Sequence, residues 1–129
     1  MTQRELAEYI ADSYGAEPEH PFKMDDVSCV FRHCDNRKWF ALTMNIPYRT
    51  LGIARDGRVD ILNLKCDPIM IGSLRGRPGF CPAYHMNKDK WITVLLDGSA
   101  EKDEIMALLA MSYELTARRR RAKSREKES

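Results

Sequence analysis

VDILNLKCDP, residues 59–68, contains two signals that together indicate the fold class. Residues 59–64 alternate with the period of two that is typical of a β-strand with one buried face. Asp67-Pro68 then predicts a helix start, because the aspartate can accept hydrogen bonds from the first free amides and proline is tolerated at the first helical position. We therefore expect a mixed domain in which a strand leads into a short helix that ends before Gly76.

Other apolar stretches on both sides of this one predict further strands. Turn-forming residues at 34–37 and the Asp56-Gly57 pair favour tight connections, so we expect two consecutive hairpins. Two shorter segments after Pro82 are expected to be extended as well. The predicted extended segments are Val27 to His33, Lys38 to Met44, Thr50 to Ala54, Val59 to Leu64, Ala83 to Met86 and Trp91 to Leu95.

Helices are predicted near both ends of the chain. Thr2 and Glu5 fit a capping box, in which each side chain satisfies the other's exposed backbone donor. Apolar residues at helical spacing follow, and they predict a first helix from Gln3 to Tyr14 that Gly15 ends. A last amphipathic helix is expected over about residues 102–117. With the predicted strands, these helices indicate an α+β protein.

Length and composition predict a water-soluble domain with its own core. The chain has 129 residues, of which 43% are hydrophobic. No stretch approaches the ~18 apolar residues of a membrane span, and the polar start does not fit a signal peptide, so we expect a cytoplasmic protein without membrane contact. The cysteines lack the dense spacing of a disulfide scaffold and are expected to be free thiols: Cys29, Cys34, Cys66 and Cys81.

The formal net charge of +2 conceals an uneven distribution. Residues 118–129 contain seven Lys or Arg against two Glu, a net of +5, whereas residues 1–117 carry a net of −3. We therefore divide the chain into a single domain, residues 1–117, and a basic C-terminal tail, residues 118–129, which we expect to be partly helical or disordered. Attraction to nucleic acid by bulk charge must come mainly from the tail.

Four motifs, in this order and spacing, resemble the MmcQ/YjbR-like family of small bacterial proteins. They are LKCDP at residues 64–68, PAYHMNK at 82–88, WITVLLDGS at 91–99 and MSY at 111–113. The resemblance spans nearly the whole chain and implies a two-layer α+β fold, with an antiparallel sheet built from hairpins and packed against N- and C-terminal helices. It also implies a family mostly of unknown function, for which a DNA-binding role with a double-wing arrangement is proposed.

Polar and aromatic residues gather in two loops that are candidates for ligand binding. Lysine, asparagine and aromatic groups beside a helix N-terminus can hold an anion such as phosphate. Structural explanations exist as well: Asp67 can cap a helix, Trp91 can fill the core and His85 can satisfy a buried carbonyl. The candidate ligand-binding residues are Lys65, Asp67, Tyr84, His85, Asn87, Lys88 and Trp91.

Basic residues in the tail and in the hairpin turns are candidates for nucleic-acid binding. The tail can bind phosphate electrostatically, and the turns can add wing-like contacts to a backbone or groove. A solvated terminus is the simpler explanation for such a basic run. The candidates are Arg37, Lys38, Arg55, Arg58, Arg118, Arg119, Arg120, Arg121 and Lys123.

The sequence contains no complete catalytic or metal-binding pattern. Cys66 and His85 would form a reactive pair only if the fold brought them within hydrogen-bond reach. On a strand, Cys29 and His33 share a face while Cys34 points away, which does not favour a metal site. We therefore expect no cofactor and no metal, and a binding module rather than an enzyme.

Two functional hypotheses follow. The leading one is weak or non-specific binding of nucleic acid through the basic tail and the hairpin turns. The alternative is an adaptor that binds a protein or a small anion with the loops at residues 65–67 and 84–91. The sequence leaves the oligomeric state open.

Overall fold

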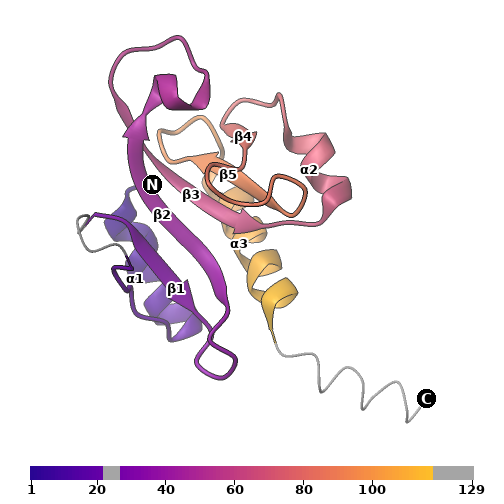
Figure 1. Cartoon of the computed structure of the whole chain (residues 1–129). Helices are drawn as coiled ribbons and strands as arrows, with labels where there is room; N and C mark the ends of the chain where they lie inside the picture. Colours follow the sequence, from indigo (N-terminus) through magenta and orange to yellow (C-terminus); the bar gives the residue numbers. More distant parts are fainter. Residues whose placement is uncertain (22–26, 118–129) are drawn as a thin grey trace.

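The computed structural model describes residues 1–21 and 27–117 of the chain. Within them, five strands form one antiparallel sheet: β1 (Cys29–Arg32), β2 (Trp39–Pro47), β3 (Arg58–Lys65), β4 (Phe80–Pro82) and β5 (Trp91–Leu95). Their order across the sheet is β1-β2-β3-β5-β4 (Figure 1). The two edge strands are the shortest, which limits the unpaired backbone that the sheet offers to other chains.

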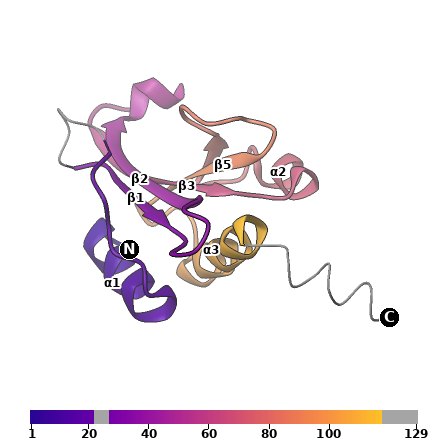
Figure 2. The same ribbon diagram turned by 60° about the horizontal axis from the view of Figure 1, so that its bottom comes forward.

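Two long helices cover one face of the sheet. Figure 2 shows α1 (Gln3–Tyr14) and α3 (Lys102–Thr116) together on this face, whereas the short α2 (Pro68–Leu74) lies beside the sheet. The capping box at the start of α1 is confirmed: Thr2 Oγ1 accepts from the Glu5 N–H at 3.0 Å, and Glu5 Oε1 accepts from the Thr2 N–H at 2.8 Å. The predicted two-layer α+β fold is thus confirmed.

The main core lies between the two long helices and the face of the sheet that they cover, which we call the helix face. It is closed by an aromatic group in which the Tyr14 and Tyr113 rings lie 4.5 Å apart and the Phe40 and Tyr113 rings 4.9 Å apart. The fully buried members of this core include Leu6, Ile10, Phe40, Leu62, Leu64, Ile92, Val94 and Leu109. Removing these side chains from water is the dominant stabilising term of the fold.

A β-bulge interrupts the pairing of β1 with β2. Phe31 pairs with Ala41 and the next residue, Arg32, pairs with Trp39, so Phe40 has no partner across the strands. Phe40 and Ala41 both belong to the main core. The bulge therefore turns two successive side chains towards the helices.

Loops cover the opposite face, which we call the loop face. A second, smaller core cluster lies there, under the 3₁₀ helix η1 (Tyr48–Leu51) and the loop that follows β4. Its buried members are Ile46, Tyr48, Val59, Ile61, Cys81 and Leu95. The loop face is thus closed over part of its length by irregular segments rather than by helices.

Two predictions about the strands are wrong. Residues 50–54 do not form a hairpin with residues 59–64, because β3 pairs directly with β2, from Pro47 opposite Arg58 to Ala41 opposite Leu64. Residues 83–86 are not a strand, because β4 ends one residue earlier. In the described part of the chain, no helix has the length and apolar character needed to cross a bilayer. The predictions for residues 118–129 lie outside the described residues.

Candidate nucleic-acid and anion interface

The two loops predicted to bind a ligand lie side by side. Lys65 and Trp91 are cross-strand partners at the ends of β3 and β5. One residue further on, the Cys66 N–H donates to the Lys90 carbonyl oxygen at 2.9 Å. The junction of β3 with α2 and the loop before β5 therefore form one continuous surface.

The structural explanations considered for single loop residues are confirmed for Asp67 and wrong for His85 and Trp91. The expectation for Asp67 is confirmed, because its carboxylate accepts a hydrogen bond from the Ile69 N–H at 2.9 Å and caps α2. The expectation that His85 satisfies a buried carbonyl is wrong, because its ring is exposed and stacks on Tyr84 at 4.0 Å. Trp91 is only half-buried and belongs to neither core cluster, so it does not fill the core.

A buried polar network holds the Tyr84 loop against the sheet. Asn63 and Thr93 are fully buried, and the Thr93 hydroxyl donates to Asn63 Oδ1. The Tyr84 N–H donates to the Thr93 hydroxyl at 2.9 Å, and its carbonyl accepts from Asn63 Nδ2 at 3.1 Å. Further along, Asn87 Oδ1 accepts from the Asp89 N–H at 2.8 Å and shapes the turn. The loop is therefore fixed by hydrogen bonds.

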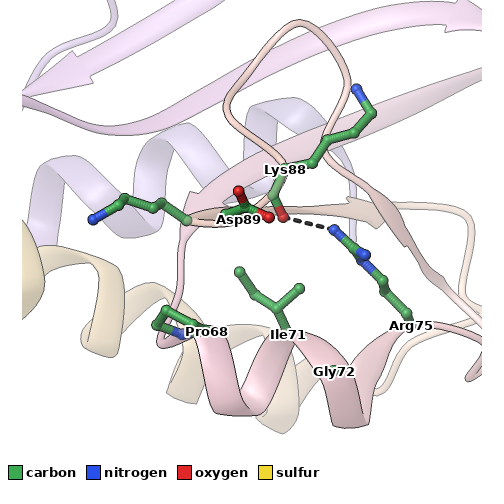
Figure 3. A pocket seen from close by; sticks show the side chains of 7 residues that line it. Pro68, Ile71, Gly72, Arg75, Lys88 and Asp89 are labelled. Atoms are coloured by element: carbon green, nitrogen blue, oxygen red, sulfur yellow. Dashed lines mark hydrogen bonds between the residues drawn. The ribbon is translucent and has the colours of Figure 1, made fainter.

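A cavity of about 340 Å³ lies between α2 and the Lys88–Lys90 turn (Figure 3). Ile71 faces it from α2, while the Arg75 guanidinium closes one side and donates to the Lys88 carbonyl oxygen at 2.6 Å. The Lys88 side chain points away from α2. The cavity is lined by Pro68, Ile71, Gly72, Arg75, Lys88, Asp89 and Lys90. A second cavity, of about 230 Å³, is lined by Thr50, Leu51, Pro82, Ala83, Tyr84 and Lys88.

The last two turns of α3, from which the basic tail continues, lie beside the end of β3 and the β1–β2 turn. Ser112 Oγ accepts from the Lys65 N–H at 2.9 Å. One turn later, about 6 Å along the helix, the Thr116 carbonyl oxygen accepts from Asn36 Nδ2 at 2.9 Å. Asn36 Oδ1 also accepts from the Lys38 N–H at 2.8 Å. Both views show the β1–β2 turn next to the end of α3 (Figures 1 and 2).

These contacts gather five cations at one end of the molecule, which we call the basic end: Lys38, Lys65, Arg75, Lys88 and Lys90. None of them takes part in an ion pair among the described residues. The nearby carboxylates, which also form no such pair, are Asp35, Asp67, Asp89 and Glu114. Five cations and four carboxylates give this end a local net charge of +1, whereas residues 1–117 as a whole carry −3.

The predicted nucleic-acid residues do not lie on a single surface. Arg37 precedes β2, whereas Arg55 and Arg58 follow it, so they are separated by the nine residues of β2, roughly 30 Å of strand. Arg55 lies 4.5 Å above the Tyr48 ring, and Arg58 Nε donates to Asn45 Oδ1 at 2.6 Å. The remaining candidates, Arg118, Arg119, Arg120, Arg121 and Lys123, lie outside the described residues.

Sequence reasoning missed two residues of the basic end, Arg75 and Lys90. It also missed Trp39, the first residue of β2, which follows Lys38 of the basic end. Arg75 could not be placed without the contact of α2 with the following turn. The other two carry a signal that was available, because Lys38-Trp39 and Lys90-Trp91 each put a lysine before a tryptophan where a predicted strand begins.

Cys66 and His85 do not form a reactive pair. Burial raises the pKa of the Cys66 thiol, and the Asp67 carboxylate raises it further, so the thiolate is disfavoured. No hydrogen bond joins Cys66 to the exposed His85 ring in the described part of the chain. All four cysteines are free. Among residues 1–21 and 27–117, no three His, Cys, Asp or Glu side chains are grouped so that they could hold a metal ion.

Comparison with known proteins gives consistent matches along the chain. The model of the YjbR family matches residues 11–115. The uncharacterized protein YyaQ of Bacillus subtilis (strain 168) is 34% identical over 116 residues, which are 90% of this chain and 98% of YyaQ.

Solved structures of similar proteins extend these matches to the fold. A crystal structure of a Pseudomonas syringae protein superposes with a TM-score of 0.88 at 46% identity, and covers 91% of this chain and 100% of its own. A crystal structure of a Deinococcus radiodurans protein with a DUF419 domain superposes with a TM-score of 0.66 at 30% identity, over 88% of this chain and 77% of its own.

Proposed function

The chain belongs to the YjbR family, and from this premise we propose that it binds nucleic acid through the basic end together with residues 118–129. One observation supports the proposal: the segments that carry Lys38 and Lys65 are joined by hydrogen bonds to the end of α3, where the chain continues into its most basic segment. Lysine and arginine side chains that neutralise phosphates release counterions, which gives binding that is independent of sequence and sensitive to salt.

The basic end supports this proposal better than the predicted wings do. Its cations have no carboxylate partner within the described residues, so they can bind phosphate without breaking an ion pair. By contrast, the Arg55 guanidinium, at the opposite end of β2, already lies 4.0 Å from the Asp97 carboxylate. The connection between β2 and β3 also contains η1 rather than a simple turn that could enter a groove.

Fluorescence anisotropy of labelled oligonucleotides tests the proposal directly. We expect the full chain to bind at low salt, the affinity to fall steeply as salt rises, and a chain truncated after Ala117 to bind much more weakly. Each phosphate contact that is lost should reduce the slope of log K against log salt by about 0.7–0.9. If the full chain binds no oligonucleotide at 50 mM salt or below, the proposal is wrong.

A pair of matched variants shows which end of the sheet binds. Lys90→Glu reverses a charge at the basic end, and Arg58→Glu makes the same change in charge at the opposite end. The proposal predicts that Lys90→Glu weakens binding and reduces its salt dependence, while Arg58→Glu has little effect. Equal losses in both variants would favour a diffuse or wing-type contact instead.

The cavity beside α2 favours a second candidate function, the binding of a small anion such as a phosphate ester. Its lining includes the cations Arg75 and Lys90 and one anion, Asp89, while Ile71 offers an apolar floor. Gly72 supports this reading, because it sits inside α2 and an added Cβ there would meet no atom within 4 Å. Glycine within a helix costs about 0.5–1 kcal/mol relative to alanine, and packing of the fold does not explain it here.

Both candidate functions are binding functions, and we propose that the protein is not an enzyme. The thiol and the imidazole that might have formed a nucleophile and a base are apart, and the pKa of the thiol is raised. Titration with inorganic phosphate and adenosine monophosphate, followed by NMR chemical shifts of the Arg75 and Lys90 amides, tests the small-anion candidate. Shifts confined to the cavity would support it, and no shift at millimolar ligand would exclude it.

A further inference from the structure

Trp91 lies on the loop face, at the basic end. Its neighbour Ile92 belongs to the main core on the helix face, and successive side chains of a strand point to opposite sides. Lys65 is its cross-strand partner and follows Leu64, which also faces the helices. Trp91 and Lys65 therefore project side by side from the loop face.

Trp39 lies on the same face because of the bulge. Phe40 and Ala41 both face the helices, and Trp39 is the cross-strand partner of Arg32, which follows the core residue Phe31. β3 alone lies between β2 and β5. The β2–β3 pairing ends at Ala41 opposite Leu64, and beyond it Ser112 Oγ accepts from the Lys65 N–H and donates to the Phe40 carbonyl oxygen, so the two strands separate there. The backbones of the two tryptophans therefore lie at least two inter-strand spacings apart, which is about 10 Å or more.

The two tryptophans lie outside the hydrophobic cores and keep part of their surface exposed. Both are half-buried, and neither belongs to the two core clusters of the described residues. Each follows an exposed lysine, Lys38 or Lys90, and Lys65 projects from the strand between them. Aromatic side chains interleaved with lysines on a sheet surface are the arrangement that proteins use to stack unpaired bases while cations track the backbone.

We propose that the basic end selects single-stranded nucleic acid, with unpaired bases stacked on Trp39 and Trp91. This inference rests on the proposed function and names its substrate class. A separation of at least about 10 Å corresponds to at least about three stacking steps of about 3.4 Å each, so one short strand reaches both rings. Bases of a duplex are stacked on one another and offer no free face to either ring, so only an unpaired strand gains the aromatic contact.

Intrinsic fluorescence tests the proposal, because the chain contains only these two tryptophans. The full-length protein and its single-tryptophan variants, Trp39→Phe and Trp91→Phe, are titrated with oligothymidine and with a hairpin duplex of the same nucleotide number. We expect oligothymidine to quench the emission of the unmodified protein and of both variants. The duplex should bind more weakly and quench little.

Affinity measurements separate stacking from charge. Trp91→Leu and Trp39→Leu keep apolar bulk but remove the ring, and each should weaken oligothymidine binding by about fivefold to a hundredfold. The salt slope should stay unchanged, because no charge is removed. Tyr9→Leu serves as the matched control, since Tyr9 is a half-buried aromatic residue on the helix side. Thermal unfolding by circular dichroism verifies that each variant is folded.

The outcomes distinguish the inference from the proposed function. Salt-dependent binding of duplex and single strand with equal affinity, without quenching, overturns the stacking platform and leaves nucleic-acid binding in place. Absence of binding to either probe at low salt overturns both. Quenching in the unmodified protein keeps the inference testable even if a leucine variant does not fold.

Discussion

Thr93→Val should destabilise the protein because it removes a hydroxyl that serves two buried groups. That hydroxyl accepts from the Tyr84 N–H at 2.9 Å and donates to Asn63 Oδ1. Valine has nearly the same shape, so packing is preserved while both groups lose their partner. A buried group without a partner costs about 1–3 kcal/mol, and water can reach the half-buried Tyr84 more easily than the fully buried Asn63. We therefore expect a loss of about 2–4 kcal/mol in the free energy of unfolding.

Urea unfolding followed by circular dichroism measures this loss. With a slope of about 2 kcal/mol per molar urea, the midpoint should fall by about 1–2 M. Thr43→Val is the matched control, because Thr43 is buried in β2 of the same sheet but its hydroxyl forms no hydrogen bond among the described residues. It should change stability by less than about 1 kcal/mol. If both variants lose the same amount, the network does not hold the Tyr84 loop and the reasoning fails.

Three further predictions concern the cavity, an aromatic cluster and the thiols. Gly72→Ala should raise the free energy of unfolding by about 0.5–1 kcal/mol and weaken phosphate-ester binding measured by NMR; tighter binding would contradict a role for the cavity. Desolvation lowers the pKa of His33 in the folded protein below its ordinary value of 6.5. Below about pH 6.5 the unfolded chain therefore binds a proton that the folded protein does not, and the free energy of unfolding should fall as the pH drops. His33→Gln should flatten this dependence in urea titrations at several pH values. In iodoacetamide labelling followed by mass spectrometry, exposed Cys34 should react well before buried Cys66, and the reverse order would show that Cys66 is activated.

Local signals in the sequence predicted the elements that depend on local chemistry. The first helix begins and ends where the capping box and Gly15 place it, since Gly15 adopts the left-handed conformation with φ of 67°. Asp67-Pro68 likewise starts α2 at the predicted residue. Such signals are readable because each acts within a few residues of the feature that it determines.

The second hairpin was predicted wrongly because tertiary pairing overrode a turn signal. Asp56-Gly57 does form a bend, and Gly57 has φ of 95°, as the pair predicts. However, residues 48–51 coil into η1, so that Tyr48 is buried and its hydroxyl donates to Asp97 Oδ2 at 2.7 Å. β2 runs on to Pro47 and pairs with β3 there. A turn motif predicts the local bend but does not determine which strand lies opposite.

The candidate interface depends on one residue that alternation cannot anticipate. In a regular strand, Ala41 facing the helices would put Trp39 on the same face and Phe40 on the other. The bulge places Phe40 and Ala41 together in the core and turns Trp39 to the loop face. Trp39 therefore projects from the same side of the sheet as Trp91, although nothing in the spacing of the two residues along the chain indicates it. If a residue inserted between Phe31 and Arg32 restored regular pairing through Phe40, Trp39 would turn to the helix face. The aromatic platform would then lose one ring even though every residue of the basic end remained.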